Sequence, residues 1–316
     1  MDLWDHNGTV VTEFLLQSLS DLHELQIFLF FVFLTIYLTT ILGNVSIMVI
    51  VVLNSQLHKP MYFFLSNLSF IDICYSSVTV PKMVINLFAV EKGISYHGCI
   101  TQLFFFHFFG STEAFLLAGM SYDRYIAICN PLRYTIIMSH HFCIQLVVTL
   151  FLLGFLHSLL HAVMMLNVSF CGPNQIKHVF CEISPMLKLS CSDTFINELL
   201  LFCVTGSIVI GCVFLIFISY YLIVSTIVKK HSVQDRHKAF STCASHLTVV
   251  LLFYGSAGIM YMWPSSWRSI EQDRVIIILY TAVTPMLNPL IYTLRNKQVK
   301  TALRQTICGK LLIAVE

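Results

Sequence analysis

Charged residues are scarce in this chain. Only 11% of its 316 residues are Asp, Glu, Lys or Arg, whereas 57% are hydrophobic. A soluble globular domain carries about 25% charged residues, so this composition excludes an ordinary soluble protein and indicates one embedded in a membrane. The basic residues do not cluster as nucleic-acid binding requires, and the net charge of +2 gives no reason to expect such a partner.

Two further absences narrow the classes of protein. The first 24 residues contain five acidic residues and no Lys or Arg, so they lack the basic region that begins a signal peptide, and we expect none. No internal repeat, low-complexity stretch or second domain is visible. Many transporters are built from such repeats, so their absence argues against a small-molecule carrier, which remains an alternative hypothesis.

Long hydrophobic stretches are what the chain has instead. Seven of them reach the roughly 20 apolar residues that a membrane-crossing helix needs. They lie at about 25–53, 60–88, 97–129, 140–166, 197–228, 238–262 and 272–294. We therefore predict an all-α membrane protein, a bundle of seven transmembrane helices over residues 25–294, with an N-terminal tail (1–24) and a C-terminal tail (295–316). In the latter, Val299, Leu303 and Ile307 share one helical face, which predicts a short amphipathic helix at the membrane surface.

The basic residues also predict the orientation of the bundle. Twelve of the 18 Lys and Arg residues lie on one side of the predicted membrane and six on the other. Basic residues gather on the cytoplasmic side, so we expect the N-terminus outside and the C-terminal helix in the cytoplasm. Asn7, in Asn7-Gly8-Thr9, is then a glycosylation acceptor. Cys308, after the C-terminal helix, is a candidate for palmitoylation.

Four of the 11 cysteines lie on the predicted outer side, where disulfides form: Cys99, Cys171, Cys181 and Cys191. Four cysteines allow three pairings. We favour Cys99 with Cys181, which would tie the third span to the middle of the long loop after Asn167, and Cys171 with Cys191, which would close that loop into a lid. The alternative is that some of them stay free. We expect the remaining cysteines to be small buried hydrophobic residues.

Several motifs then follow one another along the spans. They are Pro60-Met61-Tyr62-Phe63-Phe64-Leu65 through Asp72, Ser121-Tyr122-Asp123-Arg124-Tyr125 through Tyr134, Ser219-Tyr220, Lys238-Ala239-Phe240-Ser241-Thr242-Cys243-Ala244-Ser245-His246-Leu247, and Pro285 through Tyr292. Over nearly its whole length the chain closely resembles the odorant receptors, a branch of the rhodopsin-like G-protein-coupled receptors, and within them the large class of terrestrial vertebrates. It departs from the usual pattern at Ser121, where the family has Ala.

The resemblance implies a conformational switch at the inner end of the third span. Asp123 would hold Arg124 at rest, beside Tyr125. On activation Arg124 would swing to Tyr220 or Tyr292 and open a cleft for a G protein. The alternative is a passive anchor, because Arg side chains commonly extend towards lipid headgroups.

A polar core is implied deeper in the membrane. Glu113 precedes Arg124 by 11 residues, which places it about 16 Å deeper along a helix, and Asp72 lies at a similar depth. Ionised carboxylates at that depth are costly. Asp72, Glu113 and Asn288 would share a sodium ion, or one or both acids would be protonated and hydrogen-bonded. Pro285 and Pro289 would form a hinge.

A ligand pocket is expected in the outer half of the bundle. On the third span the spacing places His107, Gly110, Ser111 and Ala114 on one face. Opposite them the resemblance places Val204, Thr205 and Ile208 on the fifth span, Tyr254, Ala257, Gly258 and Tyr261 on the sixth, and the loop around Glu182 and Ile183. This mostly apolar lining suits a small apolar molecule. His107 is the preferred polar contact, although any one of these side chains could serve packing alone.

The sequence gives less support to other functions. Val275–Leu294 contains no Lys for a retinal Schiff base, no acid lies near Phe106 to bind an amine, and neither a nucleophile nor a metal site suggests an enzyme.

We predict a receptor for small volatile odorants that raises cyclic AMP through the stimulatory olfactory-type heterotrimeric G protein, in the plasma membrane of sensory cilia. It would need no cofactor beyond the sodium ion, and trafficking chaperones would be further partners. The alternative is a non-olfactory chemosensory receptor for a small metabolite.

Overall fold

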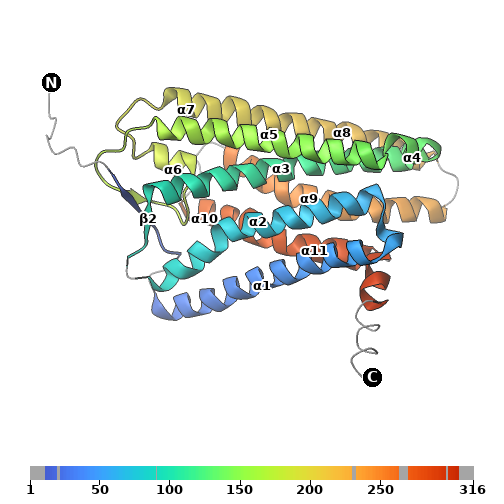
Figure 1. Cartoon of the computed structure of the whole chain (residues 1–316), viewed down its shortest axis with the longest axis horizontal. Helices are drawn as coiled ribbons and strands as arrows, with labels where there is room; N and C mark the ends of the chain where they lie inside the picture. Colours follow the sequence, from blue (N-terminus) through green and yellow to red (C-terminus); the bar gives the residue numbers. More distant parts are fainter. Residues whose placement is uncertain are drawn as a thin grey trace.

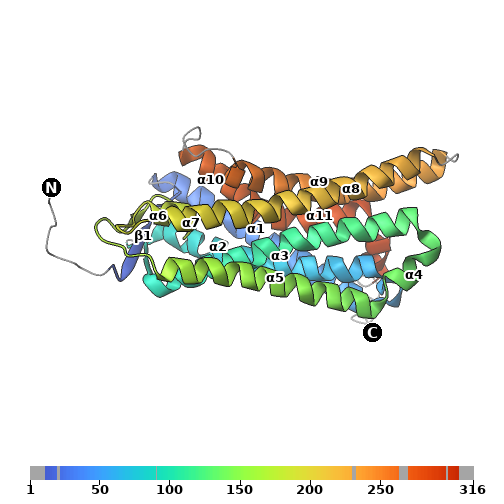
Figure 2. The same ribbon diagram turned by 90° about the horizontal axis from the view of Figure 1, so that it is seen from above.

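Seven long helices form a bundle. The computed structural model describes residues 11–19, 22–89, 91–229, 233–262, 270–296 and 298–305. Within these residues, seven helical runs are long and apolar enough to cross a membrane. They are α1 (His23–Leu53), α2 (Pro60–Phe88), α3 (Tyr96–Cys129), α5 (His140–Leu166), the run from Phe195 to Val228, α9 (Val233–Met262) and the run from Ile270 to Arg295. They run roughly along one axis (Figures 1 and 2), which confirms the predicted seven-helix membrane bundle.

Two of the seven runs are interrupted by a wider π-helical turn. One consists of α7 (Phe195–Leu200), the π turn η3 (Leu201–Thr205) and α8 (Gly206–Val228). The other consists of α10 (Ile270–Ile278), the π turn η5 (Leu279–Val283) and α11 (Thr284–Arg295). A π turn inserted into an α-helix is rare and is often found at functional sites.

Local sequence signals set several helix boundaries. Ser95 begins α3, since its Oγ accepts the N–H of Gly98 at 3.1 Å, and Ser139 caps α5 in the same way. Pro60 occupies the first turn of α2, where its missing N–H costs nothing. Short helices fill the connections: η1 (Ser55–Leu57), η2 (Pro131–Arg133), α4 (Tyr134–Ile137) and α6 (Ile183–Leu187).

Helix α3 lies at the centre of the bundle. It contacts α2, α5, α8 and α9. In its most apolar stretch 67% of the residues are buried, against 11% in α1. The apolar residues of α1 therefore face outwards, where lipid would cover them, whereas α3 is well placed to connect the two ends of the bundle.

A small sheet covers one end of the bundle, which we call the strand end. Strand β1 (Glu13–Leu16) pairs antiparallel with β2 (Gly93–Ser95) and parallel with β3 (Gln175–Ile176). It lies at the left in Figure 1. Phe14 and Leu16 are buried in a separate hydrophobic cluster there, together with parts of α3, α5 and the long loop. The N-terminal segment predicted as a plain tail therefore contributes a strand to this sheet.

Two disulfides hold the long loop at the strand end. Cys99 is bonded to Cys181 and Cys171 to Cys191, with Cα atoms 5.4 Å and 5.8 Å apart. These are the pairings favoured from the sequence. Among the remaining cysteines of the described part of the chain, three are buried, two are half-buried and Cys203 is exposed. The prediction that the remaining cysteines are buried is therefore correct for only three of these six.

The opposite end, which we call the tail end, carries the C-terminal helix. Residues 298–305 are helical. Val299 is buried, and Leu303 packs against the main core. The hydroxyl of Tyr62 on α2 donates to Oε1 of Gln298 at 2.7 Å. The predicted helix is present, but its apolar face packs against the bundle. Ile307, Cys308 and Asn7 lie outside the described residues.

Candidate functional site

A cavity of about 60 Å³ lies inside the bundle, towards the strand end. Its walls come from α2, α3, α5, η3, α8, α9 and η5. The lining residues are Tyr75, Phe106, His107, Gly110, Ser111, Ala114, His157, Thr205, Ile208, Val209, Phe253, Ala257 and Tyr280. A mostly apolar wall with a few polar groups is typical of a site for a small organic molecule.

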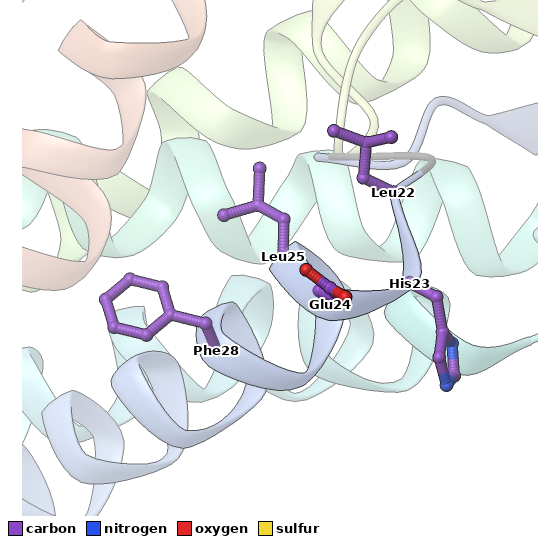
Figure 3. Close-up of a pocket in the computed structure, with 5 residues that line it drawn as sticks. All are labelled: Leu22, His23, Glu24, Leu25 and Phe28. Atoms are coloured by element: carbon purple, nitrogen blue, oxygen red, sulfur yellow. The ribbon is translucent and has the colours of Figure 1, made fainter.

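A larger hollow lies on the surface at the start of α1. It measures about 430 Å³ and is lined by Leu22, His23, Glu24, Leu25 and Phe28. These residues come from one short segment, and Figure 3 shows His23 pointing away from Leu25 and Phe28. A surface formed by one helix turn does not enclose a ligand, so we place the candidate site in the inner cavity.

Seven of the predicted pocket residues meet at the inner cavity. They are His107, Gly110, Ser111, Ala114, Thr205, Ile208 and Ala257. Four others do not line it: Val204, Gly258, Tyr254 and Ile183. The hydroxyl of Tyr254 instead donates to the carbonyl of Ala114 at 2.6 Å, and Ile183 is buried in the hydrophobic cluster at the strand end. The side chain of Tyr261 lies outside the described residues.

Several lining residues were missed from the sequence. They are Tyr75, Phe106, His157, Val209, Phe253 and Tyr280. A signal for His157 exists, because His157 and His161 are one helical turn apart in an otherwise apolar span. The aromatic residues gave no such signal, since Phe and Tyr recur throughout the spans.

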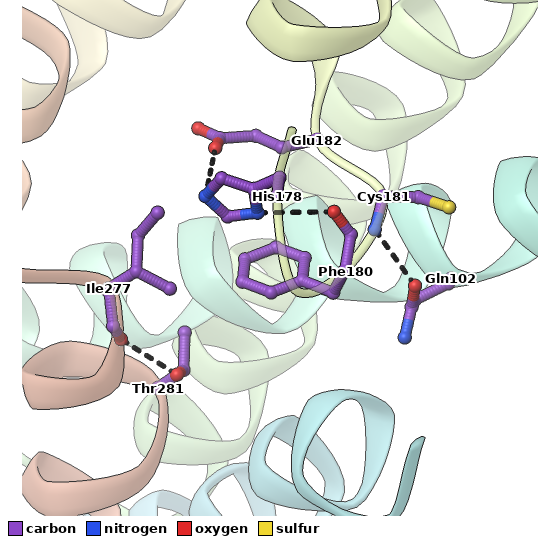
Figure 4. A network of polar contacts seen from close by, with 7 residues as sticks. All are labelled: Gln102, His178, Phe180, Cys181, Glu182, Ile277 and Thr281. Atoms are coloured by element: carbon purple, nitrogen blue, oxygen red, sulfur yellow. Dashed lines mark hydrogen bonds and ion pairs between the residues drawn. The ribbon is translucent and has the colours of Figure 1, made fainter. Parts of the chain in front are cut away.

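The long loop packs against the wall of the cavity at the strand end. The rings of Phe180 and Phe106 lie with centres 4.8 Å apart. Next to Phe180, the N–H of Cys181 donates to Oε1 of Gln102 at 3.0 Å, and Nε2 of Gln102 donates to the carbonyl of Val78 at 2.9 Å. Gln102 therefore joins the loop to α2 and α3 beside the disulfide, as Figure 4 shows for the loop contact.

His178 makes two contacts within the same loop. Its Nδ1 donates to the carbonyl of Phe180 at 3.1 Å, and its Nε2 lies 3.5 Å from the carboxyl group of Glu182 (Figure 4). Burial lowers the pKa of His178 to about 4; the hydrogen bond that the ring donates to the carbonyl of Phe180 opposes this shift, and the charge of Arg274 adds to it. At neutral pH the ring is therefore uncharged, and its contact with Glu182 is not an ion pair.

Two of the three residues of the predicted polar core are in contact inside the bundle. Nδ2 of Asn288 donates to both carboxylate oxygens of Asp72, at 2.9 Å and 3.1 Å. Glu113 is also fully buried, and neither of its oxygens has a hydrogen-bond partner within the described residues. In the same part of the chain no group of three or more His, Cys, Asp or Glu side chains is arranged to hold a metal ion.

Residues of α1 contact the two prolines of α11. Pro289 has no N–H, so the carbonyl of Pro285 loses its helical donor. Nδ2 of Asn44 supplies one at 3.1 Å. A Cβ atom at Gly43 would lie 3.0 Å from Cγ of Pro289, so glycine allows the close approach of the two helices.

Asp123 has a different partner from the one predicted. The hydroxyl of Tyr134 donates to its Oδ1 at 2.7 Å. Among the described residues there is no ion pair within 4.0 Å between Asp123 and Arg124. Adjacent residues on a helix point in different directions, which explains why Tyr134, folded back by η2, reaches Asp123 more readily. Arg124 itself is buried, and Tyr125 packs against the core.

His246 was missed as a site residue, although it lies in one of the sequence motifs given above. Its Nε2 donates to the carbonyl of Leu117 at 3.1 Å, and its Nδ1 accepts from the hydroxyl of Tyr220 at 2.7 Å. One side chain thus joins α3, α8 and α9. Tyr292 lies nearby on α11, and its buried hydroxyl has no hydrogen-bond partner in the described part of the chain.

Seven apolar helices with an inner cavity and buried polar groups define a multi-pass membrane protein built as a seven-helix bundle. A comparison with known families matches residues 33–310 to the olfactory receptor family. The chain therefore belongs to the olfactory receptor family, whose members are receptors and not enzymes.

Individual relatives agree over nearly their full length. Olfactory receptor 12D3 of Homo sapiens is 54% identical over 306 residues, covering 96% of this chain and 97% of the relative. Olfactory receptor 12D1 of Homo sapiens is 53% identical over 302 residues, covering 95% and 94%. Olfactory receptor 5AP2 of Mus musculus is 52% identical over 301 residues, covering 95% of each.

Proposed function

We propose that this protein is an odorant receptor that binds a small, mainly apolar volatile molecule in the inner cavity. The cavity carries the proposal, because it lies inside the bundle and is mostly apolar, and a loop that two disulfides constrain packs against its wall at Phe106. Ligand binding would activate a stimulatory olfactory-type heterotrimeric G protein and raise cyclic AMP. The receptor would act in the plasma membrane of sensory cilia, which it would reach with the help of trafficking chaperones.

The strand end faces outwards in this proposal. Both disulfides lie there, and disulfides form in oxidising compartments. Twelve of the 18 Lys and Arg residues lie in the sequence segments predicted to be on the side of the C-terminal helix, as expected of the cytoplasmic side. Asn7 would then be exposed to the glycosylation machinery.

The signal would travel from the cavity to the tail end through α3 and α9. Phe253 and Ala257 line the cavity, and between them Tyr254 is hydrogen-bonded to the backbone of α3. Two turns further along α9, His246 makes a second bond to α3. A ligand that shifts α9 would strain both bonds, release Tyr220 and let it or Tyr292 meet Arg124.

The polar core would regulate this transition. Asp72 and Glu113 are both fully buried, and two adjacent carboxylates at mid-membrane cannot both remain ionised without a cation. A sodium ion held by Asp72, Glu113 and Asn288 would stabilise the resting state, and protonation of one acid is the alternative.

The test is odorant-evoked cyclic AMP in cells that display the receptor. Arg124→Ala should abolish the response to a broad odorant panel at equal surface expression, because the G-protein contact is lost. Lys59→Ala is the matched control, since Lys59 is an exposed basic residue at the same end. A full response from Arg124→Ala would show that the proposed switch is wrong.

A further inference from the structure

Three histidine rings meet between α3 and α5 on one side of the cavity. The ring centres are 6.1 Å apart for His107 and His157, 5.6 Å for His107 and His161, and 4.7 Å for His157 and His161. All three side chains are buried, and His107 and His157 line the cavity. Buried polar atoms nearly always have hydrogen-bond partners, so a ring nitrogen without one calls for an explanation.

The hydrogen on the His107 ring has a fixed place. Nδ1 lies 3.0 Å from the carbonyl oxygen of Leu103. A carbonyl can only accept, so Nδ1 carries the hydrogen and Nε2 of the neutral ring presents a lone pair. This Nε2 is buried and has no hydrogen-bond partner within the described residues. His107 therefore supplies an acceptor that needs a donor.

Thr205 connects the other two rings. Its hydroxyl oxygen lies 3.1 Å from Nε2 of His157 and 3.3 Å from Nε2 of His161. A hydroxyl has one hydrogen, so it donates to one of these nitrogens and accepts from the other. When it donates to His157, the hydrogen of that ring is on Nδ1. That Nδ1 is also buried and unpartnered in the described part of the chain.

One hydroxyl group on a ligand would satisfy both nitrogens. Its hydrogen would donate to Nε2 of His107, and its oxygen would accept from Nδ1 of His157. Hydrogen bonds of this kind are about 2.8 Å long, and the two ring centres are 6.1 Å apart. A ketone, an ester or an ether cannot donate, and each would leave the acceptor on His107 unsatisfied.

A charged ligand fits this wall poorly. The described residues that line the cavity include no Lys and no Arg, so a carboxylate would be buried without a counter-charge, which is costly. Phe106, Val209 and Phe253 instead offer apolar surface to a hydrocarbon body.

We propose that the ligand is an uncharged hydroxyl compound, an alcohol or a phenol, held at His107 and His157; this proposal rests on the receptor function proposed above.

The size of the cavity favours a compact ligand. The cavity measures about 60 Å³, whereas an apolar cavity of about 150 Å³ accommodates benzene. Binding therefore requires the lining side chains to move outwards. We accordingly choose small probe molecules for the test.

The test compares functional groups on matched carbon frames. Cells with a cyclic AMP reporter receive the alcohol, the carbonyl compound, the methyl ether and the carboxylic acid of hexyl, cyclohexyl and phenylethyl frames. We expect the alcohol to be about fivefold to tenfold more potent than its ether, the factor typical of one hydrogen bond. His107→Phe should reduce this ratio to about one, and His107→Gln, which restores a polar side chain, should recover part of it.

Controls separate the hydroxyl site from folding and from receptor function. His97→Phe makes the same change at an exposed position of α3 and should keep the full preference. If His107→Phe does not reach the cell surface, Thr205→Val, which breaks the link between His157 and His161, takes its place. Equal potencies of alcohol and ether, or a preference that survives these variants, overturn the hydroxyl proposal alone. A surface-expressed receptor that responds to no odorant of any class overturns the proposed function as well.

Discussion

Replacing His246 should raise the basal activity of the receptor. The side chain is completely buried and links Leu117 on α3 to Tyr220 on α8 through hydrogen bonds of 3.1 Å and 2.7 Å. His246→Phe keeps an aromatic ring of similar size and removes both bonds. If activation separates α9 from α3 and α8, these bonds exist only in the resting state, and their loss favours the active state.

The magnitude follows from the two bonds. Each buried hydrogen bond contributes about 1 kcal/mol net, so the resting state loses about 2 kcal/mol relative to the active state. The ratio of active to resting receptor then rises about 30-fold. From a basal active fraction of about 1%, the variant would reach nearly a quarter, about 23%.

Ligand-independent cyclic AMP, measured at matched surface expression, tests this prediction. Thr248→Val is the control on the same helix, because the hydroxyl of Thr248 bonds only within α9, to the carbonyl of Ala244. It should leave the basal signal unchanged. An unaltered basal signal in His246→Phe would mean that these bonds persist on activation, and the proposed route through α9 would fail.

Two further predictions concern stability. Asn44→Ala should lower the free energy of unfolding by about 1–3 kcal/mol, because it leaves the carbonyl of Pro285 without a donor, and thermal melting of the purified receptor should show it. His178 has a folded pKa of about 4, below its ordinary value of about 6.5, so the unfolded chain binds the proton more readily. Stability should therefore fall as pH decreases from about 6.5 to about 4, by up to about 3 kcal/mol, and His178→Gln should remove this part of the pH dependence.

The bundle could be predicted from sequence because lipid imposes a simple rule. A chain must bury its backbone polar groups in helices about 20 residues long, and such lengths are visible as hydrophobic stretches. Strand β1 was missed because four residues are too few to distinguish from a tail. Its alternation was nevertheless present, with Phe14 and Leu16 buried and Glu13 and Leu15 exposed.

The site was predicted less completely, for a different reason. Spacing along one helix identifies which side chains share a face, so the positions on α3 were found. It does not show which neighbouring residue reaches them. Tyr134 as partner of Asp123, Asn44 as donor to Pro285, and His157 beside His107 are all contacts between distant segments. Such contacts depend on how the helices pack, which the sequence pattern of each helix does not contain.

Two hydrogen bonds attach helix α9 to α3 between the cavity and Arg124, the residue of the proposed switch. Tyr254 and His246 donate to the carbonyls of Ala114 and Leu117, which are three residues apart on α3. Both carbonyls lie between the cavity, which Ala114 lines, and the buried Arg124 at the tail end. A rotation of α9 sufficient to admit a ligand would therefore act on both bonds together. Because each bond is worth about 1 kcal/mol, the binding of one small molecule would be sufficient to shift the proposed equilibrium between resting and active receptor.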